Sequence, residues 1–353
     1  MSPAPPPAGE SVVELRTPGG TSQIVFEPKT LFTSSDGAVC DLIVADSNTV
    51  GLLDHDHNSM VVVVPPGESC KQPEVFTQLL AAFARCALTR DSVVAAFGGG
   101  AVTDLVAFAA SVYMRGIRVV LVPTSLLAMV DAAIGGKTGI DFHGIKNLVG
   151  SFYPADQVRI RSDLIASLPQ HEYRSGLGEV IKAAVLADTR LLELLEQQRD
   201  AVLARDRTVV AQLVRMAAQV KIDVVTRDFR ETGERAHLNL GHTFAHALEA
   251  VAGLGTWTHG EAVAWGIARA MHLGSEVAAT DARWVERVLR LLTAYGYTIQ
   301  PADADAGAIL TAMQLDKKRR KDGLRFVLQT GQHATGVYTA SEDAVERALE
   351  AHS

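Results

Sequence analysis

The second half of the chain contains histidines and a glutamate that could bind a metal ion. His242 and His246 are four residues apart, which places them on one face of a helix. His259 follows closely, and Glu179 lies upstream in the segment Gly-Leu-Gly-Glu-Val-Ile-Lys. One glutamate with two histidines is typical of a catalytic zinc site that keeps a coordination position open. Spacing alone does not decide which two histidines would bind the metal. They could be His242 and His246 together, or one of these with His259. The alternative is that these histidines are ordinary core residues.

Other residues of metal-ligating type are interpreted differently. The run Asp54–His57 alternates aspartate and histidine, and we expect a solvated loop there. Cys40, Cys70 and Cys86 have no metal-type spacing and cannot form an even disulfide framework. We therefore expect reduced, structural thiols in a cytoplasmic protein.

A glycine-rich turn in the first half is a candidate nucleotide site. Gly98–Gly100 follow a buried strand and precede a helical pattern. Glycines allow the backbone to approach a pyrophosphate, and a helix start supplies free N–H groups. The spacing differs from G-x-G-x-x-G, so a tight turn without a ligand is the alternative. The ends of neighbouring strands should complete a dinucleotide site. The polar residues at those positions, each also explained as a turn residue, are Asp46, Asn48, Glu68 and Lys71.

Two lysines are candidates for binding an anionic substrate. Lys137 and Lys146 lie in glycine-bearing segments, which we expect to be loops, and Asn147 follows directly. A lysine in such a loop is better explained as a phosphate or carboxylate ligand than as part of a solvated helix face. Asp131 lies inside an apolar helical run, where an unpaired carboxylate would be costly. We expect a cationic partner or a ligand hydroxyl beside it.

Two types of element must position these residues. In the first half, short β-branched runs alternate with helical patterns, which predicts a Rossmann-like parallel sheet with crossover helices. The expected strands are 41–45, 61–64, 92–97 and 118–122. After about residue 160 helical patterns dominate, and 325–328 is the clearest strand. The expected helices there are 173–187, 189–204, 209–226, 242–252, 261–279 and 282–295.

Length and composition set further bounds. A chain of 353 residues exceeds one ordinary core, so we expect two domains. The predicted division is a flexible tail over 1–12, an α/β nucleotide-binding domain over 13–162, and a mainly helical metal- and substrate-binding domain over 163–353. The net charge of −7 argues against a nucleic-acid partner. The start of the chain does not have the pattern of a signal peptide, and no stretch reaches the roughly 20 apolar residues of a membrane span.

Taken together, the motifs resemble the sugar-phosphate cyclase superfamily and most closely its 3-dehydroquinate synthase family. In order they are GGGxxxD, YMRG, VPTSLLAMVD, GGKTG, GxKN, GLGEVIK, NLGHTFAHAxE and HGEAVA, spread from about Asp46 to Leu328. The chain departs from the family pattern at Thr103, where glycine is commoner, and at Ala132 and Ala133, where serines are.

The resemblance implies a role for each matching residue. The metal, usually zinc with cobalt as a substitute, would be bound by Glu179, His242 and His259. NAD would be bound by Asp46, Asn48, Glu68, Lys71, Gly99, Gly100, Asp104, Thr124, Ser125, Lys137 and Lys146. Catalytic roles would fall to Asp131, Lys137, Asn147, Lys182, Glu231 and His246. Substrate would be bound by Arg115, Lys146, Lys221, Arg235 and Asn239, with Lys317 or Lys318 reaching the phosphate.

The resemblance also implies a reaction and an assembly. The family converts 3-deoxy-D-arabino-heptulosonate 7-phosphate to 3-dehydroquinate and phosphate, using NAD without net redox change, in the shikimate pathway of aromatic amino-acid biosynthesis. Arg115 would act across the interface of a homodimer. The alternatives are a cyclase of the aminodehydroquinate, valiolone or deoxy-inosose type, or a metal-dependent alcohol or glycerol dehydrogenase. Lys221 and Arg235 disfavour the valiolone and deoxy-inosose types, whose substrates lack a carboxylate. The phosphate-binding set Lys137, Lys146 and Asn147 disfavours the dehydrogenases.

Overall fold

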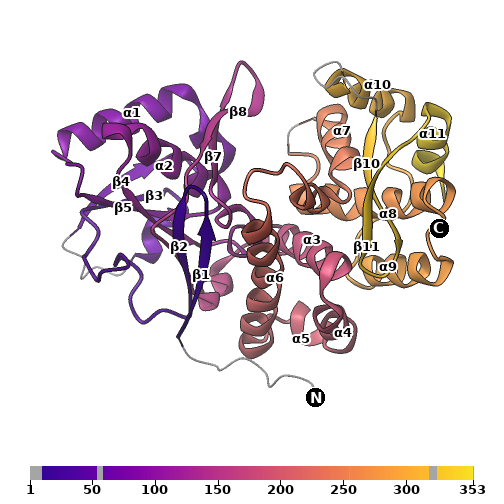
Figure 1. Ribbon diagram of the computed structural model, residues 1–353, viewed down its shortest axis with the longest axis horizontal. Coiled ribbons are helices and arrows are strands. Elements are labelled where there is room, and N and C mark those ends of the chain that lie inside the picture. Colours follow the sequence, from indigo (N-terminus) through magenta and orange to yellow (C-terminus); the bar gives the residue numbers. More distant parts are fainter. Residues whose placement is uncertain (1–9, 54–58, 254, 318–323, 353) are drawn as a thin grey trace. The chain divides into compact units, whose positions relative to one another are not determined.

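The computed structural model describes residues 10–53, 59–253, 255–317 and 324–352. The chain forms two compact units (Figure 1). The first comprises Met1–Leu168 and Lys221–Arg230, and the second comprises Pro169–Val220 and Glu231–Ser353. Residues 221–230, which lie inside the predicted second domain, thus group with the first unit. The run Asp54–His57 and Lys318 lie outside the described residues.

The first unit is built on a mostly parallel sheet, which confirms the predicted fold class. Its strand order is β1-β2-β9-β6-β5-β3-β4, and only β1 and β2 pair antiparallel. Strands β3 and β5 are buried along their whole length, as expected of a parallel sheet covered on both faces. The strands are β1 (Ser11–Thr17), β2 (Gly20–Phe26), β3 (Leu42–Asp46), β4 (Met60–Val64), β5 (Val93–Gly98), β6 (Arg118–Pro123) and β9 (Gln157–Ile160).

Helices α1 (Pro73–Arg85) and α2 (Gly100–Val112) are the crossovers of this sheet. The edge hairpin β1–β2 was not predicted, and its first strand begins at Ser11, inside the expected tail. An edge strand is half solvated: Val12 is 52% exposed, so the segment lacks the long apolar run that indicates a buried strand.

A second hairpin corrects the expected positions of the two anion-binding lysines. Strands β7 (Lys137–Phe142) and β8 (Ile145–Phe152) pair antiparallel across a turn in which His143 and Gly144 both have positive φ. Lys137 therefore begins a strand and Lys146 lies within one. The sequence pattern did not predict this hairpin, because the segment contains several glycines and glycine is rare in strands. Here one of them is required, since a Cβ on Gly150 would lie 2.0 Å from the Thr138 carbonyl oxygen of the paired strand.

The second unit is mainly helical, as predicted. Its helices are α3 (Gln170–Ala187), α4 (Thr189–Gln197), α5 (Arg199–Leu203), α6 (Arg207–Arg227, continuing into the first unit), α7 (His242–Ala252), α8 (His259–Val277), α9 (Ala282–Ala294), α10 (Ala306–Lys317) and α11 (Glu342–Glu350). The expected helix 189–204 is divided at Gln198 into α4 and α5. Strands β10 (Arg325–Gly331) and β11 (Ala334–Thr339) form a hairpin, of which only the first strand was predicted.

Helix α8 is the central element of this unit. It contacts α3, α7, α9, α11 and β10 and is apolar on nearly every side, which is the pattern of a buried helix. Its one buried arginine, Arg269, donates to the carbonyl oxygens of Ala348 and Leu349 at the end of α11. None of the helices in the described ranges is long and apolar enough to cross a lipid bilayer. All three cysteines are free thiols.

Candidate active site

Helix α3 supplies a buried carboxylate and a buried amine to the second unit. Glu179 and Lys182 are three residues apart and therefore neighbours on one helix face. Lys182 Nζ lies 2.5 Å from Glu179 Oε2, and the two side chains are 4% and 1% exposed. Both Glu179 oxygens are buried without a hydrogen bond of good geometry among the described residues. A buried carboxylate needs a cation beside it, and Lys182 supplies one on the side of Oε2.

Two histidines converge on the same carboxylate. His242 is the first residue of α7 and His259 the first residue of α8. Their Nε2 atoms lie 3.7 Å and 3.3 Å from Glu179 Oε1. One ligand atom from each of the three residues lies within 4.8 Å of the other two. Of the sets that spacing left open, the structure therefore brings together Glu179, His242 and His259.

Burial and neighbouring charges shift the pKa values of the three residues in this cluster. Burial alone would raise the pKa of Glu179, but Lys182 and the two histidines hold it well below its usual value. Burial and the charge of Lys182 hold the pKa of His242 well below its usual value. Burial would also lower the pKa of His259, yet the carboxylates of Glu179 and Glu249 that face its ring raise it to about 9. An anionic glutamate with a neutral His242 is already in the ligating state for a divalent cation.

The backbone around each histidine is fixed by local sequence. Gly241 has φ +80, and a Cβ there would lie 2.7 Å from the amide nitrogen of Ile267, so only glycine fits before α7. Before α8, Thr258 and Glu261 form a reciprocal capping box. Gly260, which directly follows His259, donates a hydrogen bond from its amide to Ser175 Oγ on α3 at 3.1 Å. These contacts set where His242 and His259 start their helices.

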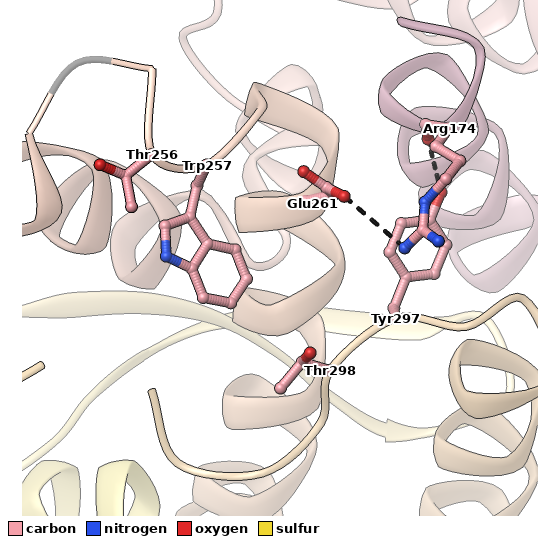
Figure 2. A pocket seen from close by; sticks show the side chains of 6 residues that line it. All are labelled: Arg174, Thr256, Trp257, Glu261, Tyr297 and Thr298. Carbon is pink, nitrogen blue, oxygen red and sulfur yellow. Dashed lines mark hydrogen bonds and ion pairs between the residues drawn. The ribbon is translucent and has the colours of Figure 1, made fainter. Parts of the chain in front are cut away.

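A small pocket borders the segment that carries His259. Its volume is about 230 Å³, and Figure 2 shows Trp257 and Glu261 on one side and Arg174 and Tyr297 on the other. The Arg174 guanidinium lies 3.6 Å from Glu261 and over the Tyr297 ring at 5.4 Å. None of the predicted site residues lines this pocket. Its ion pair connects α3 to the start of α8, which is a structural role.

His246 and Glu249 extend the cluster along α7. The ring centroid of His246 lies 5.4 Å from that of His242 and 6.2 Å from that of His259. Glu249 Oε1 lies 3.4 Å from His259 Nδ1. Glu249 is not among the predicted site residues. Its position three residues after His246 and seven after His242, on one helix face, was the available signal.

The described residues fit a divalent metal. Glu179, His242 and His259 provide one oxygen and two nitrogen donors, which is a set that zinc accepts. His259 Nδ1 faces the carboxylate of Glu249, and the second ring nitrogen of a metal-ligating histidine usually has such a partner. These three ligands would leave a fourth coordination position for a substrate oxygen or water, as in catalytic rather than structural zinc sites.

In the first unit, several of the predicted cofactor residues lie at or just after the carboxyl ends of parallel strands. Asp46 ends β3, Gly98 ends β5, and Thr124 follows β6 and donates its amide to the Gly98 carbonyl at 2.9 Å. Asp46 Oδ1 accepts from the amides of Asn48 and Thr49 at 2.8 and 2.9 Å, which fixes the turn after β3. Nucleotides bind at this edge of open α/β sheets.

The start of α2 leaves room for a phosphate. No side chain in the described part of the chain caps the helix at Gly99. A Cβ on Gly99 would meet only Ser125 Oγ, at 3.6 Å, so the space a side chain would fill is open. A Cβ on Gly98 would instead lie 2.7 Å from Val102, so that glycine serves packing. Free helix N–H groups beside such a space fit a pyrophosphate.

Lys71 forms a hydrogen-bonded cluster with Asp104 of α2 and Asn147 of β8. Lys71 is 2% exposed, donates to Asp104 Oδ2 at 2.7 Å, and also donates to Asn147 Oδ1. Burial raises the pKa of Asp104 to about 6 even though Lys71 opposes that shift. Glu68 and Asn48 are exposed. The family resemblance implies NAD binding for Lys71 and a catalytic role for Asn147, whereas the structure places the two side chains in contact.

The remaining predicted residues are placed as follows. Asp131 lies in a short helix and is paired with Lys221, which supplies the cation expected beside it. In the second unit Asn239 Nδ2 donates to Glu231 Oε1 at 2.6 Å, and Arg235 is 1% exposed. Arg115 follows α2, is exposed, and has φ +68. Lys137 and Lys146 are exposed on the β7–β8 hairpin, and Lys317 is the last residue of α10.

Comparison with known families gives a consistent result. Residues 61–175 match the family described as 3-dehydroquinate synthase N-terminal, and residues 176–319 match 3-dehydroquinate synthase C-terminal. The chain is 42% identical over 296 residues to the 3-dehydroquinate synthase of Xylella fastidiosa (strain M12), which covers 82% of this chain and 80% of that protein.

Solved structures of related enzymes share the fold. The 2-epi-5-epi-valiolone synthase of Streptomyces hygroscopicus, solved with NAD+ and Zn2+ bound, is 26% identical with a TM-score of 0.83, covering 92% of this chain and 95% of that one. A 2-deoxy-scyllo-inosose synthase complexed with carbaglucose-6-phosphate, NAD+ and Co2+ is 20% identical with a TM-score of 0.84, covering 96% of this chain and 99% of that one.

Proposed function

The chain belongs to the 3-dehydroquinate synthase family, and from that premise we propose that it converts 3-deoxy-D-arabino-heptulosonate 7-phosphate to 3-dehydroquinate and phosphate. The enzyme is a carbon–oxygen lyase that uses NAD and a divalent metal, most favourably zinc. The supporting observation is the convergence of Glu179, His242 and His259, with Lys182 beside them, in the unit that follows the nucleotide-type sheet. We assign the product to the shikimate pathway of the cytoplasm.

The two bound groups would supply chemistry that side chains lack: NAD accepts and returns a hydride at one carbinol carbon, and the metal polarises its oxygen. Glu179, His242 and His259 would hold the metal. The helix start at Gly99 and the strand ends at Asp46 and Thr124 would hold the dinucleotide.

The other residues would bind and orient the substrate. Once the carbinol is a ketone, the neighbouring C–H is acidic; its proton passes to an oxygen of the substrate's own phosphate, a C–C double bond forms, and the C–O bond to phosphate breaks. The chain then needs no strong general base, and its task is to hold both ends of one molecule through several steps. We assign this task to Asp131, Lys137, Lys146, Asn147, Lys182, Lys221, Glu231, Arg235, Asn239 and His246, with Lys317 or Lys318 at the phosphate.

We also propose a homodimer in which Arg115 completes the phosphate site of the partner subunit. Arg115 is exposed and has φ +68, and Met114 before it has φ +48. Two successive non-glycine residues in the left-handed region are costly, and such strain persists where the surroundings require it. Symmetric dimers are the commonest soluble assemblies.

The decisive experiment measures phosphate release from the heptulosonate phosphate with NAD present in amounts far below the substrate. We expect many phosphates released per NAD and no accumulation of NADH, because the hydride returns within the same turnover. Stoichiometric NADH formation from a simple polyol would support a dehydrogenase instead. Turnover only of sugar phosphates that lack a carboxylate would support one of the sister cyclases.

A further inference from the structure

We propose that Glu249 is a positioning residue of the metal centre, which fixes the ring of His259 so that Nε2 faces the metal. The inference rests on the proposed metal-dependent function and assigns a role to a residue outside the three donors. Glu249 lies on α7 and His259 at the start of α8, ten residues later.

The two nitrogens of His259 face two different carboxylates. Nε2 lies 3.3 Å from Glu179 Oε1, at the centre of the donor cluster. Nδ1 lies 3.4 Å from Glu249 Oε1, on the other side of the ring. When Nε2 binds the metal it cannot carry a proton, so the one proton of the neutral ring is on Nδ1. A carboxylate can only accept, and Nδ1 therefore donates this proton to Glu249.

His259 needs such a constraint more than the other two donors do. Its side chain is 34% exposed, whereas those of His242 and Glu179 are 12% and 1% exposed. The capping box and the Gly260–Ser175 hydrogen bond fix its backbone, but they leave the ring free to turn about its side-chain torsions. The rings of His242 and His246 contact it at centroid distances of 5.3 and 6.2 Å. Packing of this kind restricts the tilt of the ring but does not decide which nitrogen is protonated.

Burial supports the same role for Glu249. Its side chain is 18% exposed, which is low for a glutamate near a helix end. One donor atom each from His246, Glu249 and His259 also lies within 4.8 Å of the others, so a second metal ion is the competing explanation. An ion bound through Nδ1 of His259 would require the ring to lose both protons when Nε2 binds the first ion. A hydrogen bond requires no such loss, and we therefore favour it.

The test compares metal binding by the full-length metal-free protein and two variants, with Co2+ alone as the probe. Glu249→Gln keeps the size of the side chain and removes its charge. Glu286→Gln makes the same change at an exposed position of α9 in the same unit and serves as the matched control. Co2+ affinity, stoichiometry and visible absorption are recorded, together with the thermal midpoint of each metal-free protein.

For Glu249→Gln we expect the dissociation constant for Co2+ to rise by about 10- to 100-fold, as for other partners of ligating histidines. The stoichiometry should stay at one, the visible bands should shift, and the metal-free midpoint should match the parent. Glu286→Gln should bind as the parent does. An unchanged affinity and spectrum for Glu249→Gln would overturn the inference while leaving the proposed function intact. Two bound Co2+ ions in the parent and one in Glu249→Gln would also overturn it, because Glu249 would then be a ligand of a second ion. A parent protein that binds no Co2+ would instead refute the metal-dependent function itself.

Discussion

The amide of Gly260 donates a hydrogen bond to Ser175 Oγ at 3.1 Å, and the start of α8 lies directly against the backbone of α3. A Cβ on Gly260 would lie 1.7 Å from the Ser175 carbonyl oxygen. Glu179 lies one turn beyond Ser175, and His259 directly precedes Gly260. The distance between two of the proposed metal ligands therefore depends on a glycine that has no chemical function of its own.

Gly260→Ala should separate these two helices. Relieving the clash requires backbone movement, which typically costs about 1–3 kcal/mol. We expect a lower thermal midpoint and a weakened zinc affinity, measured on the purified variant. Gly331→Ala, where a Cβ would meet nothing within 4 Å, is the control in the same unit. Parent-like zinc binding by Gly260→Ala would show that the contact does not position the donors.

Removal of the metal should abolish turnover. Prolonged chelation followed by removal of the chelator is expected to leave an inactive protein, because Glu179, His242 and His259 alone cannot polarise the substrate oxygen. Addition of Zn2+ or Co2+ should restore activity, and neither ion should rescue His242→Ala. Full activity in a preparation shown by elemental analysis to be metal-free would refute the assignment.

Arg235→Ala should weaken recognition of the substrate carboxylate. A guanidinium offers a planar pair of donors to that group, and a charge-assisted hydrogen bond contributes about 1.5–3 kcal/mol. We expect kcat/KM to fall by about ten- to a hundredfold or more, with partial recovery in Arg235→Lys. Since Arg235 is 1% exposed, circular dichroism must first show that the variant is folded. Unchanged kcat/KM would favour a sister cyclase whose substrate has no carboxylate.

Arg115→Ala and Glu179→Ala should complement each other if Arg115 acts on the partner subunit. A mixed dimer then has one site with both defects and one intact site. Random pairing makes half of the dimers mixed, so activity should return to about a quarter of the parent level, as the two-subunit arrangement requires. Verified subunit exchange without recovery would place Arg115 in the site of its own chain, or limit it to a structural role.

His272 on α8 should make stability depend on pH. Burial and the charge of Arg269 lower the pKa of His272 to about 4, below the value near 6.5 of an unfolded histidine. The unfolded state therefore binds the proton more readily, so the stabilisation is complete above about pH 6.5 and is lost as the pH falls towards 4. His272→Gln should narrow the difference in unfolding midpoint between about pH 7.5 and about pH 5. An unchanged difference would assign the acid sensitivity to other groups.

The sequence by itself determined the family, the fold class and the residue types of the site. Alternating β-branched and helical patterns predicted the parallel sheet, because both faces of such a sheet are buried and its strands are continuously apolar. The half-solvated β1 and the glycine-containing β7–β8 hairpin lack that pattern and were missed. A motif identifies candidate site residues reliably because all of its residues lie within one short segment of the chain.

Tertiary structure decided which of those residues meet. Helical spacing placed His242 and His246 on one face, but the donor atoms that converge on Glu179 come from the starts of α7 and α8. That choice depends on where α3 packs against α8, and hence on Gly260, which no local periodicity reveals. The contacts of Lys71 with Asp104 and of Glu249 with His259 have the same origin. A side-chain contact between different elements is fixed by packing, and a local sequence pattern carries no record of it.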